Sequence, residues 1–143
     1  MAFNQDQIDR LSSSFALVEP RIDDVIATFY TKLFETAPSV RELFPDDMSG
    51  QKKHLGSALK LVAQNVSDIE KLADPLRQMG ARHVGYGAQE AHYPVVRDTM
   101  LFALAEVAGY AWTPQLNDDW GAALNAVAGY MIEGQQQAEA KAA

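Results

Sequence analysis

The feature that most constrains the fold of this chain is the position of its six prolines relative to its apolar residues. Apolar side chains recur three and four residues apart through most of the sequence, which is the spacing of one face of a helix. Every proline lies where such a stripe stops or restarts, as expected because proline ends helices but is tolerated in their first turn. No run alternates apolar and polar residues as a half-exposed strand does. The sequence therefore predicts an all-α fold.

The stripes bound the expected helices. Asp74-Pro75 and Thr113-Pro114 each place a good capping residue before a proline, and Ser49 is a further capping candidate. A short helical turn is expected at 38–44. We expect one domain over 1–143, with a polar, helix-prone tail that frays at about 135–143. The long helices are expected near 6–18, 22–34, 51–66, 75–83, 93–107 and 114–131.

The composition excludes several classes of function. A formal net charge of −7 and a pI near 4.8 argue against nucleic acid or anionic membranes as partners, since both need a basic surface. The chain has no cysteine, which excludes disulfides, thiolate-bound iron, iron–sulfur clusters and cysteine nucleophiles. No basic and apolar leader and no apolar run of about 20 residues is present, so a cytoplasmic location is expected.

His83 is the first candidate site residue. Leu76, Met79 and His83 stand at i, i+3 and i+7 and so share one face of a helix. An imidazole at the end of an apolar stripe is either a core histidine bonded to a backbone carbonyl or the single protein ligand of a metal in an apolar cavity. The three histidines form no HxxxH or HxxE pair, so their spacing does not support zinc.

Five short segments, taken together and in order, make the chain resemble the globin family. Within that family the resemblance is to bacterial flavohaemoglobins and their single-domain relatives. It spans about 7–132, nearly the whole chain. Each segment alone is a weak signal, and the collinear set is specific. The segments are FYTKLF (29–34), VRELF (40–44), NVSDIEKL (65–72), GARHVGYG (80–87) and AHYPVV (91–96).

The resemblance implies a three-over-three helical sandwich that holds one haem b. In such a fold His83 is the proximal iron ligand and Phe44 is the aromatic wedge against the porphyrin. Leu55 forms the apolar distal wall, and Tyr30 with Gln51 forms the distal polar pair. Both distal side chains can donate hydrogen bonds to bound O2, and such bonds count for more in an apolar pocket than in water.

His54 is an alternative distal residue, because the segment KKHLGSAL resembles the distal helix of vertebrate globins. If His54 held that place, the apolar wall would be Ala58. Counting back from His83 without gaps favours Gln51 instead. His54 then lies near the pocket mouth, where it meets a haem propionate or solvent.

On the proximal side the resemblance implies further roles. Arg82 is a second propionate candidate, and Tyr93 is the tyrosine that backs the proximal histidine. The glutamate that the family pairs with that histidine is less clear, since the gapless register puts Gln137 there, with Glu133 one turn earlier. This departure puts a strong electronic push on the iron in doubt.

The expected function follows from the distal pair. Two donors slow O2 release, which suits chemistry on bound O2 better than transport. The family precedent is the conversion of nitric oxide to nitrate, so O2, NO and CO are the expected ligands, and a separate reductase is an expected partner. The alternatives are a module for O2 storage, delivery or sensing, and a helical signalling domain with an empty pocket.

Overall fold

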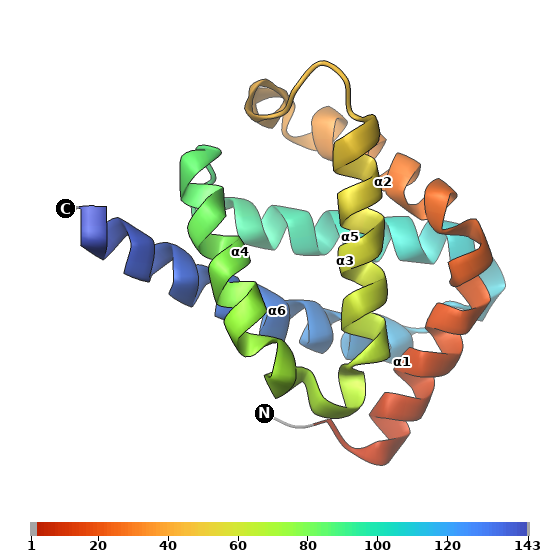
Figure 1. The fold of residues 1–143 in the computed structure, drawn as a ribbon. Coiled ribbons are helices and arrows are strands. Elements are labelled where there is room, and N and C mark those ends of the chain that lie inside the picture. Colours follow the sequence, from red (N-terminus) through yellow and green to blue (C-terminus); the bar gives the residue numbers. More distant parts are fainter. Residues whose placement is uncertain (1–2, 143) are drawn as a thin grey trace.

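Six α-helices, joined by short 3-10 turns and loops, make up most of residues 3–142, the part of the chain that our computed structural model describes (Figure 1). No strand occurs among these residues, and the predicted all-α fold is confirmed. A short helical turn, η2 (Pro38–Leu43), lies where the sequence predicts it. The helices are α1 (Gln5–Val18), α2 (Ile22–Thr36), α3 (Ser49–Gln64), α4 (Ala73–Gly85), α5 (His92–Ala108) and α6 (Pro114–Ala142).

The predicted cap at Thr113 is confirmed, and the one at Ser49 is wrong. The Thr113 hydroxyl accepts a hydrogen bond from the Leu116 amide at 3.1 Å, at the start of α6. At the start of α3 the cap position belongs to Met48, and Ser49 is the first helical residue. The Asp47 carboxylate accepts hydrogen bonds from both the amide and the hydroxyl of Ser49. Asp47, one residue before the cap position, therefore satisfies the amino end of α3.

The predicted cap at Asp74 is also wrong. Helix α4 begins at Ala73, and its cap position is Leu72, which makes no capping bond with its side chain. The cause is η3 (Val66–Leu72), a 3-10 segment with a kink at Asp68 that runs directly into α4. A helix that continues from another helical segment needs no polar cap, because the preceding carbonyls already bond its first amides.

Two hydrophobic clusters form the core. The larger cluster gathers side chains of α1, α2, α3, α5 and α6, including Phe29, Leu104 and the fully buried Trp120. The smaller cluster lies between α3, η3, α4 and α6 and is built from Val62, Ile69, Leu72 and Leu76. In Figure 1, α5 and α6 pass behind α3 and α4.

A close crossing of backbones joins α4 to α6. A Cβ atom on Gly80 would overlap the backbone of Met131, and a Cβ atom on Gly134 would overlap the carbonyl of Arg77. Glycine therefore stands at both points because only it lets the two helices approach so closely. This crossing fixes α4, and with it His83, against the longest helix of the chain.

The C-terminal tail extends α6. The sequence predicts a tail that frays from about residue 135. In the structure the helix instead continues to Ala142, and Gln135 within it is only 2% exposed. Over the described residues, no helix combines the length and apolarity needed to cross a membrane.

Candidate functional site

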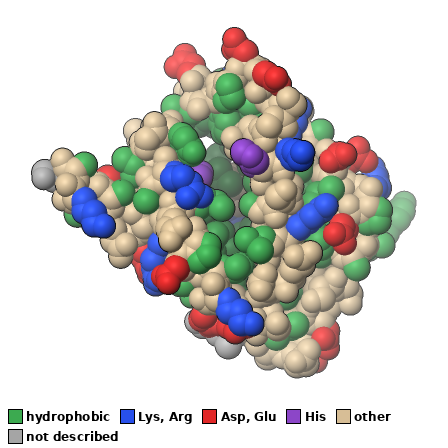
Figure 2. Space-filling model, viewed as in Figure 1, with side chains coloured by type: hydrophobic (Ala, Val, Ile, Leu, Met, Phe, Trp, Pro, Cys, Tyr) green, Lys and Arg blue, Asp and Glu red, His purple; other side chains and the backbone are tan. Residues whose placement is uncertain are grey.

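A hollow between α3 and α4 marks the candidate site. Figure 2 looks onto this face and shows a depression with hydrophobic side chains in its depth and basic side chains on both of its flanks. The distal candidates Tyr30, Phe44 and Leu55 belong to or pack against the larger cluster. Leu76 and Met79, which precede His83 on its helix, belong to or pack against the smaller one. The distal candidates and the residues that precede His83 therefore belong to two separate parts of the core.

Tyr30 and Gln51 form a polar pair at the edge of the larger cluster. The Gln51 side-chain Nε2 donates to the Tyr30 hydroxyl oxygen at 3.2 Å. Tyr30 is 4% exposed, and burial raises the pKa of its phenol above 10.0, an effect that the Gln51 bond partly offsets. The hydroxyl hydrogen of Tyr30 has no acceptor among the described residues, so it is free to donate to a ligand in the hollow.

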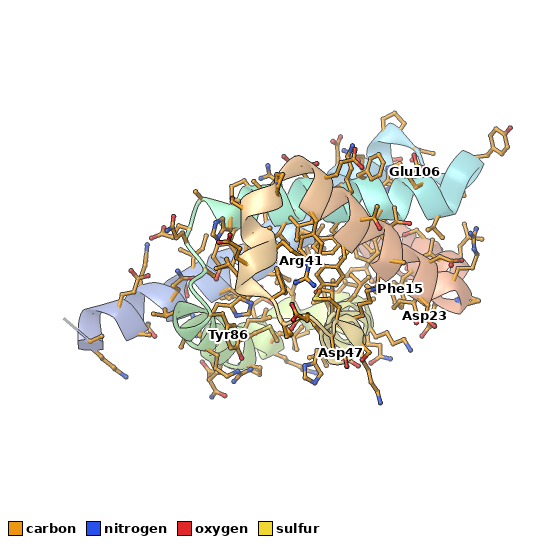
Figure 3. The ribbon with its side chains drawn as sticks, turned by 90° about the horizontal axis from the view of Figure 1, so that it is seen from above. Phe15, Asp23, Arg41, Asp47, Tyr86 and Glu106 are labelled. Atoms are coloured by element: carbon orange, nitrogen blue, oxygen red, sulfur yellow. The ribbon has the colours of Figure 1, made fainter. Side chains whose placement is uncertain are left out.

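Phe44 is held against Tyr30 by its neighbours. The two rings meet edge to face with centroids 5.7 Å apart, and Phe34 packs on Phe44 at 5.4 Å. Arg41, labelled in Figure 3, donates to the carbonyl oxygens of Phe44 and Pro45 at 3.3 and 3.0 Å while its guanidinium lies over the Phe34 ring. Arg41 thereby holds the segment between η2 and α3 in the shape that turns Phe44 inward.

His83 has the geometry of a neutral histidine with one nitrogen available. Its Nδ1 donates to the Met79 carbonyl at 2.6 Å, which leaves the lone pair on Nε2. Burial lowers the pKa of the His83 imidazole below 6.5 and the nearby Arg82 charge lowers it further, against an opposite effect of the Met79 bond. Every fully buried polar side-chain atom in the described residues has a partner, whereas Nε2 has none, so Nε2 reaches accessible space.

A buried amide network lies behind α4. The Tyr93 hydroxyl donates to Gln135 Oε1 at 2.7 Å, and Gln135 Nε2 donates to the Ala88 carbonyl at 2.7 Å. The gapless register puts Gln137 at the place of the glutamate that pairs with the proximal histidine, and that prediction is wrong, because Gln137 is exposed. Glu133 is not the partner either: it forms a surface ion pair of 2.8 Å with Arg77. The residue behind Tyr93 is thus neutral.

The remaining candidates lie at the periphery. Leu55 is half-buried and packs against the larger cluster, whereas the side chains of His54 and Arg82 are exposed on α3 and α4. Gln51, not His54, is the α3 side chain that meets Tyr30.

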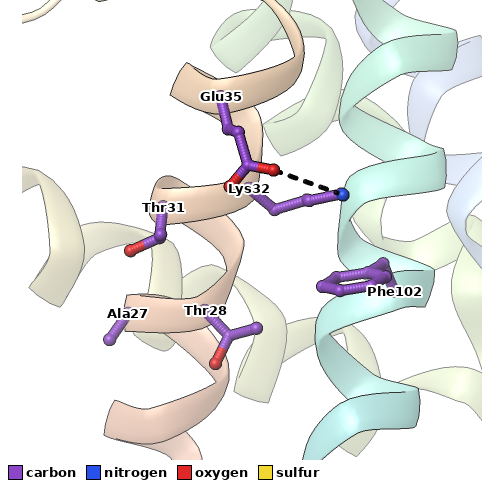
Figure 4. Close-up of a pocket in the computed structure, with 6 residues that line it drawn as sticks. All are labelled: Ala27, Thr28, Thr31, Lys32, Glu35 and Phe102. Atoms are coloured by element: carbon purple, nitrogen blue, oxygen red, sulfur yellow. Dashed lines mark ion pairs between the residues drawn. The ribbon is translucent and has the colours of Figure 1, made fainter.

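A second hollow lies on the outer surface between α2 and α5. It has a volume of about 360 Å³ and contains none of the candidate residues. Figure 4 shows Lys32 paired with Glu35 at 3.8 Å, and the ammonium also lies 4.7 Å from the centre of the Phe102 ring. Its charges are satisfied by each other, so this groove offers no unpaired group for chemistry.

With this geometry in place, comparison with known proteins decides the family. The globin family model matches residues 27–131. This range includes every candidate residue named above except three near the end of α6, which are Glu133, Gln135 and Gln137. The chain belongs to the globin family. Its helical architecture is the globin fold.

Relatives of this globin include proteins of several kinds. Leghemoglobin-1 of Lupinus luteus is 28% identical over 85% of this chain and 88% of its own length. The flavohemoprotein of Bordetella pertussis is 32% identical over 73% of this chain, which covers 27% of that protein. The flavohemoprotein of Bacillus subtilis is 26% identical over 87% of the chain, which covers 32% of it. This globin thus spans about a third or less of the flavohemoproteins.

Solved structures agree on the fold. A putative nitric oxide dioxygenase from Rhodothermus marinus, solved as an engineered carbene transferase, superposes with a TM-score of 0.87 at 27% identity over 97% of both chains. The flavohemoglobin of Malassezia yamatoensis, solved with bound FAD and heme, gives a TM-score of 0.83 at 16% identity over 98% of this chain and 38% of its own.

Sequence reasoning missed two positioning residues, Gln135 and Arg41. Gln135 stands in the polar run GQQQAEAK, where nothing distinguishes it from its neighbours except its helical phase with Gly134 and Met131. Arg41 acts on backbone carbonyls, and such bonds leave no spacing pattern in a sequence.

Proposed function

We propose that this globin binds haem b between α3 and α4 through His83 and uses the site for reactions of O2 with nitric oxide. The observation that supports the proposal is that two buried or half-buried candidate residues each keep one group that no described residue occupies. His83 offers a lone pair on Nε2, and Tyr30 offers a hydroxyl hydrogen. An apolar hollow with one imidazole ligand fits the haem group in its donor set.

When bound, haem supplies an iron with an open coordination position at which O2, NO or CO binds. The residues of the chain do the rest. His83 presents a neutral imidazole whose orientation is fixed by the Met79 carbonyl. Phe44 and Leu55 keep the ligand side apolar and exclude water. His54 and Arg82 are proposed to meet the haem propionates at the surface.

Tyr30 and Gln51 are proposed to stabilise a ligand that gains negative charge. Gln51 donates to Tyr30, which polarises the phenol and strengthens it as a donor toward the hollow. A preorganised donor in an apolar site favours a ligand that carries partial negative charge, as O2 does, over the neutral CO. Strong retention of O2 favours reaction on the site over release.

The reaction class is the union of NO, O2 and an electron to give nitrate, so an electron donor is required. We propose a separate reductase as that donor and the cytoplasm as the compartment. The likeness to a putative nitric oxide dioxygenase and to flavohemoproteins supports this proposal. The bound FAD of the Malassezia flavohemoglobin makes a flavoprotein the first donor to try.

The test is spectroscopic and then catalytic. We expect purified protein reconstituted with haem b to give a Soret band, and His83→Ala to abolish imidazole-ligated spectra in the ferric, ferrous and ferrous-CO forms. His92→Ala, at the start of α5, is the matched control and leaves the spectra unchanged. Imidazole-ligated spectra that persist in His83→Ala overturn the assignment of His83.

For the reaction, the haem-loaded protein with O2 and a flavoprotein reductase should consume NO and yield nitrate in equal amounts. Rapid O2 release with no NO consumption would favour the storage or sensing alternative and overturn the dioxygenase proposal.

A further inference from the structure

The helix that forms one flank of the hollow carries charge of a single sign. Helix α3 contains three lysines, Lys52, Lys53 and Lys60, and no acidic residue, although the chain as a whole has a formal net charge of −7. All the other α-helices contain acidic side chains. Figure 2 shows basic side chains along this flank of the hollow. A positive stripe therefore lies on α3 in an otherwise acidic molecule.

The charges of this stripe are not neutralised within the protein. Lys52 and Lys53 are exposed, Lys60 is half-buried, and none of the three forms an ion pair with a described residue. Unneutralised charges of one sign are available to a charged partner. Cations elsewhere in the chain do form such pairs, namely Arg10, Arg21, Lys32, Lys71, Arg77 and Arg97.

We propose that the surface formed by Lys52, Lys53, Lys60 and Leu61, here called the α3 basic face, docks the acidic face of the flavoprotein that supplies this globin with electrons. The inference rests on the proposed function, since it needs a haem group to receive the electron. Leu61 follows Lys60 directly and is 40% exposed. An apolar side chain among charged ones is the usual composition of a transient protein interface.

The position of the hollow limits where an electron donor can dock. Electron transfer between proteins slows steeply with distance, so the flavin has to approach the face at which the bound group comes closest to the surface. In the proposed site that face lies between α3 and α4. One electron passes from the reduced flavin, which becomes a semiquinone, to ferric iron, which becomes ferrous, and no covalent bond forms or breaks.

A donor that is a separate protein has to be recruited from solution. Opposite charges near the site raise the rate of encounter and orient the partner. Because the rest of this globin is acidic, an acidic donor is attracted to the α3 basic face and repelled by the other surfaces, which gives specificity. Asp46 and Asp47, in the turn before α3, bound the α3 basic face at one end.

The experiment is the salt dependence of ferric haem reduction. The ferric, haem-loaded protein is mixed by stopped flow with fully reduced flavodoxin, a small acidic flavoprotein, at salt from about 10 mM to about 300 mM. Two acidic proteins without a docking face repel each other, so salt would raise the rate constant. We expect the rate constant to fall several-fold instead, because salt screens the attraction of the α3 basic face.

Charge reversal locates the docking surface. We expect Lys53→Glu to lower the rate constant several-fold at low salt and to leave it unchanged at high salt. Lys141→Glu, at the exposed end of α6, makes the same change in net charge and is the matched control, so it should keep the wild-type rate constant. Photoreduced lumiflavin, which carries no charge, should reduce all three proteins at one rate and so shows that the haem site is intact in each.

A rate constant that rises with salt in the wild-type protein, or equal losses in Lys53→Glu and Lys141→Glu, overturns the inference. So does sedimentation as a dimer at low salt that Lys53→Glu dissociates, since a second copy of the chain then covers the α3 basic face. The absence of a Soret band is seen before any reductant is added and overturns the haem proposal itself. Reduction with the expected salt dependence but without NO consumption supports the docking surface and overturns only the dioxygenase proposal.

Discussion

Gln51 donates a hydrogen bond to the Tyr30 hydroxyl oxygen across 3.2 Å, which leaves the phenolic hydrogen of Tyr30 available to a further acceptor. The Gln51 amide uses one of its two hydrogens in this bond, whereas Tyr30 uses only its oxygen. The pair is therefore arranged in series, with Gln51 supporting Tyr30.

Tyr30→Phe should speed O2 dissociation more than Gln51→Leu does. Removing one hydrogen bond worth about 0.5–1.5 kcal/mol corresponds to an increase of about 2- to 10-fold, and the Gln51 variant loses only the support. Stopped-flow displacement of O2 by CO measures both rates. Lys53→Ala, which alters another exposed side chain of the same helix, leaves the rate unchanged. Equal effects of the two variants would contradict the series arrangement.

Stability should fall in alkaline solution because of the buried phenols. Burial, and then the charges of Glu90 and Glu139, raise the pKa of Tyr93 above 10.0. As the pH rises through 10.0, the unfolded chain loses this proton before the folded one, so the free energy of unfolding falls. Urea unfolding at about pH 9 and about pH 11 measures the fall. Tyr93→Phe removes part of it, and an unchanged fall in that variant would refute the assignment.

Much of the fold follows from the sequence, because helix formation and termination are encoded locally. The stripes and prolines predict the number and order of the helices, since a buried face repeats within one segment. The errors lie at helix starts such as Ser49 and Asp74. At Asp74 the outcome depends on the preceding residues already being helical, and at Ser49 it depends on the neighbouring Asp47 carboxylate, neither of which a single capping residue reveals.

The site is less predictable, because its parts come from segments far apart in the chain. Tyr30, Gln51 and His83 could be named through the family resemblance, and the structure brings Gln51 to Tyr30. Gln135 could not be named in this way, because a shift of two residues in the register of α6 exchanges a buried glutamine for an exposed one. The crossing of α4 and α6 at Gly80 and Gly134 sets the register of α6, and no local sequence pattern predicts this contact.

Gln135→Leu should destabilise the protein by about 1–3 kcal/mol, because it leaves the Tyr93 hydroxyl buried without an acceptor. Chemical denaturation of the haem-free protein measures this loss. A double-mutant cycle with Tyr93→Phe should give a coupling energy of about 0.5–3 kcal/mol. Gln137→Leu, at the exposed position two residues on, should stay within about 0.5 kcal/mol of the wild type. A comparable loss of stability in Gln137→Leu would contradict the role of Gln135 and support the register predicted from the sequence.

Gly80→Ala should destabilise the crossing of α4 and α6 by about 1–3 kcal/mol, since the new methyl group meets the backbone of Met131, which cannot move without shifting the helix. Gly129→Ala is the matched control on α6. Its methyl group meets no atom within 4 Å, and alanine is the better helix former by about 0.5–1 kcal/mol. Urea unfolding should therefore move in opposite directions for the two variants. Because α4 carries His83, Gly80→Ala should also speed haem loss to an acceptor such as apomyoglobin, whereas Gly129→Ala should not. A stabilising effect of both alanines would mean that the two helices do not approach as closely as the structure has them.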